Sequence, residues 1–104
     1  MGRFVIVVFK PKPDKQHALA AVVAQHFRVL RAENLVTERA PYVMHTTSGS
    51  VIEVFEWRSP EAIAAAHSNP AVQALWKEFA EVCDYVPLAS LDEAQQMFAE
   101  FDAA

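Results

Sequence analysis

The sequence predicts an α+β domain whose elements follow the order βαββαβ. Three observations predict it: strand-forming residues gather at 4–9 and 51–57, apolar residues recur at three- and four-residue steps in two longer segments, and helix-start signals precede those segments. Both strand segments are apolar at odd and even positions alike, whereas a sheet with one solvated face should alternate apolar and polar residues. The sequence therefore predicts a sheet that is covered on both faces.

The first strand is expected at Phe4–Phe9, and it ends where Lys10–Pro13 supplies two prolines without backbone donors. Asp14 is expected to cap a long helix that runs to about Glu33. Asn34 is expected to end this helix in a left-handed conformation. The apolar stripe of the helix consists of Leu19, Val22, Val23, His26, Phe27 and Leu30.

A β-hairpin is expected next, with strands at 41–47 and 50–58 around a turn at Ser48-Gly49. The sequence leaves open which face of this hairpin looks toward the helices. A two-residue turn would set the register and place His45, Ile52, Val54 and Glu56 on one face and Tyr42, Met44, Glu53, Phe55 and Trp57 on the other.

Ser59-Pro60-Glu61 opens the second helix with a cap, a first-turn proline and an acid at the positive end of the dipole. The helix is expected to break at 67–70, where Asn69 can cap a second segment that Pro70 opens. The apolar stripe of that segment consists of Val72, Leu75, Trp76, Phe79, Val82 and Cys83.

The tail is expected to hold the fourth strand. Ser90–Glu93 fits a capping box that opens a short helical turn, which leaves Met97–Asp102 as the favoured strand. Tyr85–Ala89 is the alternative position for it.

Length and charge narrow the class of protein. A chain of 104 residues is expected to form a single domain over 1–104, and two helices can cover only one face of its sheet. A second copy of the chain is the expected cover for the other face, which agrees with an apolar fraction of 53%. A net charge of −4 with scattered lysines and arginines disfavours nucleic acid as a partner, and the strand at 51–57 lacks the glycine-aromatic signature of RNA-recognition domains.

The single Cys83 cannot form an internal disulfide, no signal-peptide pattern stands at the N-terminus, and no apolar run is long enough for a membrane span. A cytoplasmic protein without membrane contact is therefore expected.

The stretch Glu56-Trp57-Arg58-Ser59-Pro60-Glu61-Ala62, followed by His67 and by Asn69-Pro70, resembles the pattern of the antibiotic biosynthesis monooxygenase family. The motif spans about 53–76, while the order of elements resembles the family over nearly the whole chain. One departure is visible, because His67 follows Trp57 by ten residues where family members commonly have nine, which rotates a helical side chain by roughly 100°.

The resemblance implies a ferredoxin-like βαββαβ fold with a four-stranded antiparallel sheet, paired as a dimeric α+β barrel. It also implies a cavity between sheet and helices in each subunit, used in some members for cofactor-independent oxygenation of aromatic or polyketide substrates. The haem-degrading branch places an asparagine, a tryptophan and a histidine where this chain has Val8, Ala66 and Trp76, so haem degradation is disfavoured.

Chemistry in an apolar cavity needs a titratable group tuned by burial. The candidate catalytic residues are His67, Glu53, Glu56 and His45. Glu53 is expected to be buried, either as a functional carboxylate or in a structural ion pair, for example with Arg3 across the dimer. His67 faces the cavity or satisfies backbone carbonyls at the helix break. The candidate pocket residues, which helical spacing equally explains as core, are Trp57, Trp76, Phe79 and Tyr85.

The expected function is that of a cofactor-independent monooxygenase acting on a small hydrophobic aromatic or polyketide-type substrate. The alternative is a dimeric binding or sensing protein that holds a small hydrophobic ligand without turnover. No cofactor is expected, and four dispersed histidines give no metal-ligand spacing.

Overall fold

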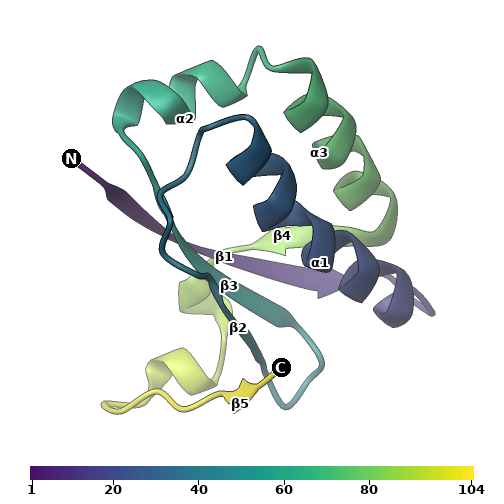
Figure 1. The fold of residues 1–104 in the computed structure, drawn as a ribbon. Coiled ribbons are helices and arrows are strands. Elements are labelled where there is room, and N and C mark those ends of the chain that lie inside the picture. The colour runs from purple at the N-terminus through teal and green to yellow at the C-terminus, as the bar shows by residue number, and fades with distance from the viewer.

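Five strands form one antiparallel sheet in the order β4-β1-β3-β2-β5, with the three α-helices on one of its faces (Figure 1). The computed structural model describes all 104 residues. The elements are β1 (Arg3–Pro11), α1 (Gln16–Ala32), β2 (Tyr42–His45), β3 (Val51–Trp57), α2 (Pro60–Ala66), α3 (Pro70–Val82), β4 (Cys83–Val86), the 3₁₀ turns η1 (Leu88–Ser90) and η2 (Glu93–Gln95), and β5 (Asp102–Ala103). No helix combines the length and the apolar character that a membrane crossing requires.

The predicted α+β class and its ferredoxin-like topology are confirmed. The strand order β4-β1-β3-β2 is that of a βαββαβ domain, in which β1 and β3 are neighbours at the centre of the sheet. Along the chain, β1 and β3 are connected through α1 and the hairpin. The short β5 is an addition at the β2 edge, so the sheet has five strands where four were expected.

The predicted position of the fourth strand, Met97–Asp102, is wrong. The fourth strand is β4, which continues directly from α3 because Cys83 adopts an extended conformation and pairs with Pro11. The alternative prediction, Tyr85–Ala89, overlaps the end of β4. The apolar residues at 97–98 instead point into solvent, and only Asp102–Ala103 forms a strand there.

Helix α1 starts later than predicted. Asp14 has a φ of 63° and therefore lies outside the helix, and Lys15 precedes the first turn without a side-chain cap. Asn34 ends the segment with a φ of 60°, as its short side chain permits. The predicted stripe is buried at Leu19, Val22, Val23, His26 and Leu30.

The hairpin register differs from the predicted one by one residue. His45 pairs with Val51, and the Thr46 N–H donates to the carbonyl of Ser50, so the loop has three residues, 47–49. The reason is the position of Gly49, whose φ of 92° suits the left-handed place that closes a three-residue loop. The shift turns every β2 side chain over, and His45 now shares the helix-facing side with Glu53.

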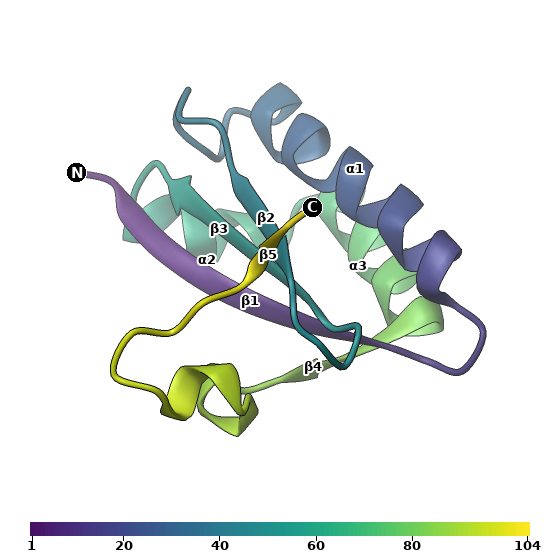
Figure 2. The ribbon, with the colours of Figure 1, turned by 90° about the horizontal axis from the view of Figure 1, so that it is seen from below.

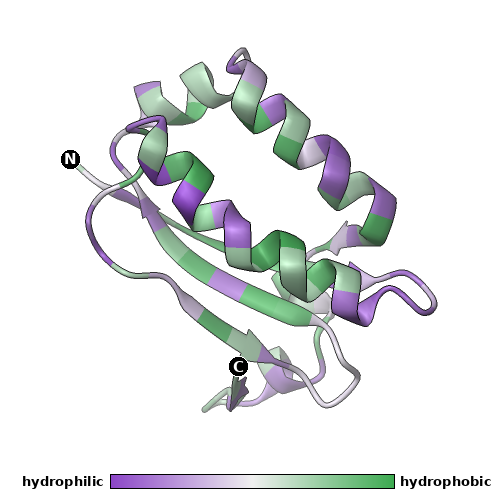
Figure 3. Cartoon of the chain, turned by 45° about the vertical axis from the view of Figure 1, so that its right-hand side comes forward, coloured by the Kyte–Doolittle hydropathy of each residue, from purple (hydrophilic) through white to green (hydrophobic).

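Local chemistry fixes the two helix starts on the second half of the chain. Ser59 Oγ accepts from the Ala62 N–H at 3.1 Å, and Asn69 Oδ1 accepts from the Ala71 N–H at 2.9 Å. The predicted break between α2 and α3 is therefore confirmed. The apolar sides of α1 and α3 face the sheet, as the hydropathy colouring shows (Figure 3).

The tail covers part of the outer sheet face, which was expected to be covered by a second copy of the chain alone. Segment 87–101 crosses the side of the sheet opposite the helices (Figures 1 and 2). There Leu91 packs with Val8 and Ile52 in a small buried cluster. The predicted capping box does not form, since Ser90 Oγ donates to the Pro87 carbonyl and no side chain caps η2. Phe4, Ile6 and Tyr42 stay exposed on this face.

Candidate active site

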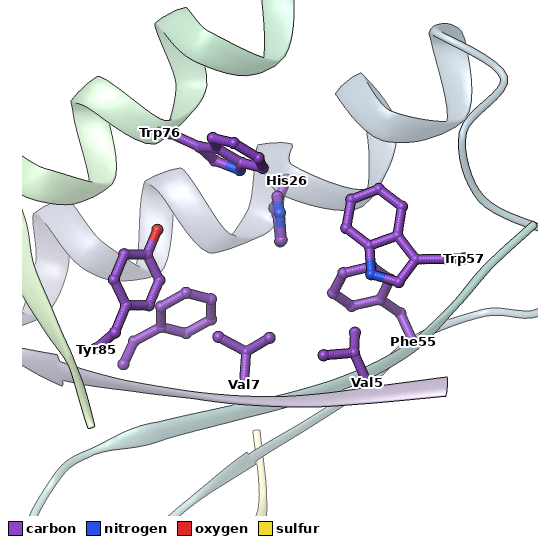
Figure 4. A pocket seen from close by; sticks show the side chains of 8 residues that line it. Val5, Val7, His26, Phe55, Trp57, Trp76 and Tyr85 are labelled. Atoms are coloured by element: carbon purple, nitrogen blue, oxygen red, sulfur yellow. The ribbon is translucent and has the colours of Figure 1, made fainter. Parts of the chain in front are cut away.

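An apolar cavity of about 300 Å³ lies between the helices and the sheet (Figure 4). Its floor comes from β1 and β3, and its walls come from α1, α3 and β4. Eight residues line it: Val5, Val7, Phe9, His26, Phe55, Trp57, Trp76 and Tyr85. Its size falls at the lower end of the range of small-molecule sites.

His26 and Glu53 form a buried pair at the edge of this cavity. His26 Nδ1 and Glu53 Oε1 are 2.5 Å apart, and the two residues are 4% and 1% exposed. Helix periodicity turns His26 toward the sheet, and the strand alternation of β3 turns Glu53 toward α1. The carboxylate thus has the partner that a buried charge requires.

The hydrogen bond decides which nitrogen of His26 can do chemistry. We assign the proton on Nδ1 to the bond with Glu53, because an ionised carboxylate only accepts. Nε2 has no partner within the protein, and the structure leaves no fully enclosed polar side-chain atom unpaired. Since His26 lines the cavity, Nε2 opens onto it with a free lone pair.

Aromatic rings hold the imidazole in place. The rings of Phe55 and Phe79 meet it nearly at right angles, with centroids 5.3 and 5.0 Å away. Phe79 in turn stacks on Phe9 at 4.6 Å with planes 4° apart. Such packing limits the rotation of His26, so the direction of Nε2 is set by the core.

Three hydrogen-bond donors also border the cavity. Trp57 and Trp76 bring their indole rings to it, and Tyr85 brings its hydroxyl from β4 (Figure 4). None of these donor groups is hydrogen-bonded to another part of the protein. Burial, with a smaller contribution from Cys83, raises the pKa of Tyr85 to about 12, so its hydroxyl remains a donor over the neutral range.

Three of the four predicted pocket residues line the cavity, namely Trp57, Trp76 and Tyr85. Phe79 does not, because it is fully buried behind Phe9 and serves the core. Among the predicted catalytic residues, Glu53 is buried as expected, and its partner is His26 rather than Arg3.

The other predicted catalytic residues do not line this cavity, although the ring of His67 packs against Trp76 in its wall. His67 is exposed and its Nδ1 donates to the Ile63 carbonyl at 2.9 Å, which is the structural alternative at the helix break. Glu56 lies on the outer sheet face, where it binds Arg39 and Thr37. His45 sits at the end of β2, at the rim of a different groove.

His26 is the candidate site residue that sequence reasoning missed. Its place on an apolar stripe identified it as a packing residue. The available signal was the coincidence of two lone polar residues in apolar settings, His26 on a helix and Glu53 in a strand, each of which needs a buried partner.

No family model matches the chain, and no curated protein matches it in sequence. Among solved structures, it is similar to a protein from Chloroflexus aurantiacus J-10-fl described as a "putative Antibiotic biosynthesis monooxygenase". The two share 18% identity with a TM-score of 0.63, over 85% of this chain and 94% of that chain. The resemblance seen in the sequence is therefore matched by a structure with the same fold.

Proposed function

We propose that the chain is a small cofactor-independent oxygenase that acts on an electron-rich aromatic compound. The observation that carries the proposal is the buried His26–Glu53 pair, whose free Nε2 faces an apolar cavity. A carboxylate behind an imidazole, with the other nitrogen aimed at a substrate site, is the arrangement of a general base. The fold shared with the Chloroflexus protein supports the choice of oxygenation.

In the proposed reaction, His26 Nε2 removes a proton from a methylene group activated by flanking aromatic rings or carbonyls. The carbanion gives an electron pair to O₂ in two one-electron steps, a C–O bond forms, and the resulting peroxide takes the proton back from His26. Loss of the second C–H proton then breaks the O–O bond. The methylene becomes a carbonyl, and the other oxygen atom leaves as water, so atoms and electrons balance without a further reductant.

The surrounding residues have separate roles in this scheme. Glu53 stabilises the imidazolium that forms when His26 accepts the proton, because the opposite charges are in contact in a dry environment. The indole N–H groups of Trp57 and Trp76 and the hydroxyl of Tyr85 can donate to substrate oxygens as these gain negative charge. The valines of β1 exclude water from the carbanion.

Oxygen uptake by the pure protein tests the proposal. One- and two-ring aromatic compounds that carry a methylene group activated by flanking rings or carbonyls are the substrates to offer, since the cavity of about 300 Å³ excludes large ones. His26→Ala and Glu53→Gln should each lower the rate by roughly 10²–10⁴-fold. His17→Ala is the matched control and should retain full activity, because His17 is exposed near the start of α1 and does not line the cavity.

The proposal fails if no substrate of this class is consumed, or if His26→Ala is as active as the unmodified chain. Saturable binding of these aromatics without oxygen uptake would favour the alternative, a protein that binds a small hydrophobic ligand without turnover.

We also propose that the chain works as a homodimer joined through its outer sheet face. Phe4, Ile6 and Tyr42 are 58, 49 and 73% exposed on that face, and Met97 and Phe98 of the tail add two more exposed apolar side chains. Such a group of apolar residues is typical of an interface. A second copy would remove it from water.

A further inference from the structure

A second cavity lies on the other side of the His26–Glu53 pair. This groove of about 460 Å³ runs between α1 and β2, along the edge of the sheet that the helices leave open. The active-site cavity has none of its lining residues in common with the groove. The groove is lined by Ala20, Val23, Ala24, Phe27, Pro41, Val43, His45, Val51, Glu53 and Ala104.

The groove exists because small side chains face β2. Ala20 and Ala24 are one helical turn apart on α1, so they present methyl groups where longer side chains would reach the strand. Below them, Val43 pairs directly with Glu53 and forms the floor. The walls are apolar, and no lysine or arginine lines them.

Glu53 is the polar element of the groove and gives it chemical selectivity. Its Oε1 atom is engaged by His26, whereas Oε2 has no partner within the protein. Glu53 is only 1% exposed, and no fully enclosed polar side-chain atom is left unpaired. Oε2 must therefore reach the space of the groove, which Glu53 lines. A carboxylate oxygen at the bottom of an apolar groove needs a hydrogen-bond donor.

We infer that this groove is a binding site for a small primary amine with an apolar body. The ammonium group would donate to Glu53 Oε2, in a charge-assisted bond that no cationic side chain of the groove competes for. The apolar body would lie against Ala20, Ala24 and Val43. His45, at the rim, is the other titratable side chain that lines the groove.

Occupancy of the groove reaches the active site through Glu53. An ammonium on Oε2 and an imidazolium on Oε1 share one negative charge, so the bound amine weakens the support that Glu53 gives to protonated His26. This step rests on the proposed function. The bound amine should therefore slow oxygen uptake without competing for the aromatic cavity.

Benzylamine is the probe, with benzyl alcohol as its uncharged counterpart. Methyl-resolved NMR of the full chain at millimolar benzylamine should show saturable shifts at Ala20, Ala24 and Val43, and smaller ones at Val5. Benzyl alcohol should bind about tenfold more weakly or worse, because its hydroxyl can donate to Glu53 Oε2 but carries no positive charge to attract the carboxylate. Glu53→Gln should weaken benzylamine by a similar factor.

Two alanine variants decide the location even if Glu53→Gln fails to fold. Ala24→Leu fills the groove and should abolish the shifts, whereas Ala21→Leu, at a position of the same helix that does not line the groove, should keep them. Equal binding to both variants, the absence of saturable shifts, or shifts centred on Val5 would overturn the inference. If benzylamine binds in the groove but the protein consumes no oxygen, the proposed function is wrong and the amine site stands. If the protein consumes oxygen but does not bind benzylamine, the amine site is wrong and the proposed function stands.

Discussion

His26 and Glu53 are 27 residues apart in the sequence, and their Nδ1 and Oε1 atoms are 2.5 Å apart in the fold. One side chain comes from α1 and the other from the central strand β3, so the contact joins the helix layer to the sheet. Each residue is the partner that keeps the other satisfied in an apolar interior. Loss of either side chain therefore leaves the other one buried without its partner.

Removing one member of the pair should cost far more stability than removing both. His26→Leu leaves a buried carboxylate without its partner and should lower the free energy of unfolding by about 3–5 kcal/mol. The double variant His26→Leu/Glu53→Leu leaves no unpaired charge, so it should be clearly more stable than His26→Leu while lacking activity. Urea unfolding at neutral pH measures both.

Additive losses in the double variant would contradict this expectation, because they would mean that the two side chains do not interact. Val7→Leu, which changes a neighbouring apolar residue without touching either charge, controls for repacking of the same region.

Cys83 should make stability depend on pH in the alkaline range. Burial, aided by Asp84 and opposed by Lys12, raises the pKa of its thiol from 9.0 to about 11. The folded chain then holds this proton more tightly than the unfolded chain, so its contribution to stability is complete below pH 9 and is lost as the pH rises toward 11.

Urea unfolding between pH 8 and 10 compares the unmodified chain with Cys83→Ala, and the variant should show a shallower decline. Above pH 10 the raised pKa of Tyr85, about 12, adds a decline of the same sign, which Tyr85→Phe should remove. Parallel curves for the unmodified chain and Cys83→Ala would show that the folded thiol ionises as it does in the unfolded chain.

Glu93 should hold the tail on the sheet in a pH-dependent way. The backbone N–H of Thr47 donates to its Oε2 at 2.9 Å, and this bond keeps the pKa of Glu93 below its usual value of 4.5. A lowered pKa means that the contribution is present above pH 4.5 and is lost as the pH falls through the folded value. The protection factors of residues 88–95 against hydrogen exchange, which correct for the intrinsic pH dependence of exchange, should therefore fall on acidification.

Glu93→Gln should show this lower protection already at neutral pH. Glu100→Gln is the control, because no hydrogen bond to the Glu100 side chain is present. Unchanged exchange in Glu93→Gln would place the anchor of the tail in Leu91 and its apolar contacts instead.

The outer sheet face should control the oligomeric state. Ile6→Lys places a charge in the middle of the exposed apolar group and should convert the proposed dimer into a monomer, as measured by light scattering at micromolar concentration. Ala64→Lys, on the exposed side of α2, should leave the dimer intact. A monomeric unmodified chain would contradict the proposed assembly.

Much of the fold could be predicted because its signals are local. Ser59 and Asn69 cap their helices with bonds to residues two or three positions ahead, and Asn34 takes its left-handed conformation without distant help. The errors came where a choice depended on distant residues. A capping-box pattern at 90–93 left 97–102 as the favoured strand, although β4 had the free edge of β1 available directly after α3.

Only part of the candidate site could be predicted from the sequence. Glu53 could be identified as a buried carboxylate because its neighbours in β3 are apolar, and Trp57, Trp76 and Tyr85 could be identified as aromatic candidates. His67 and Glu56 were chosen from motif and residue type, and the structure places the first on the surface and the second on the opposite sheet face.

The sequence by itself determined the class of fold, the helix boundaries set by caps, and the need for a buried partner at Glu53, since these follow from periodicity, local hydrogen bonds and the cost of an isolated charge. Tertiary structure decided that the partner is His26. A three-residue loop also turned His45 toward α1, and two alanines left a groove behind the carboxylate. These outcomes depend on strand register and helix packing, which only distant contacts can fix.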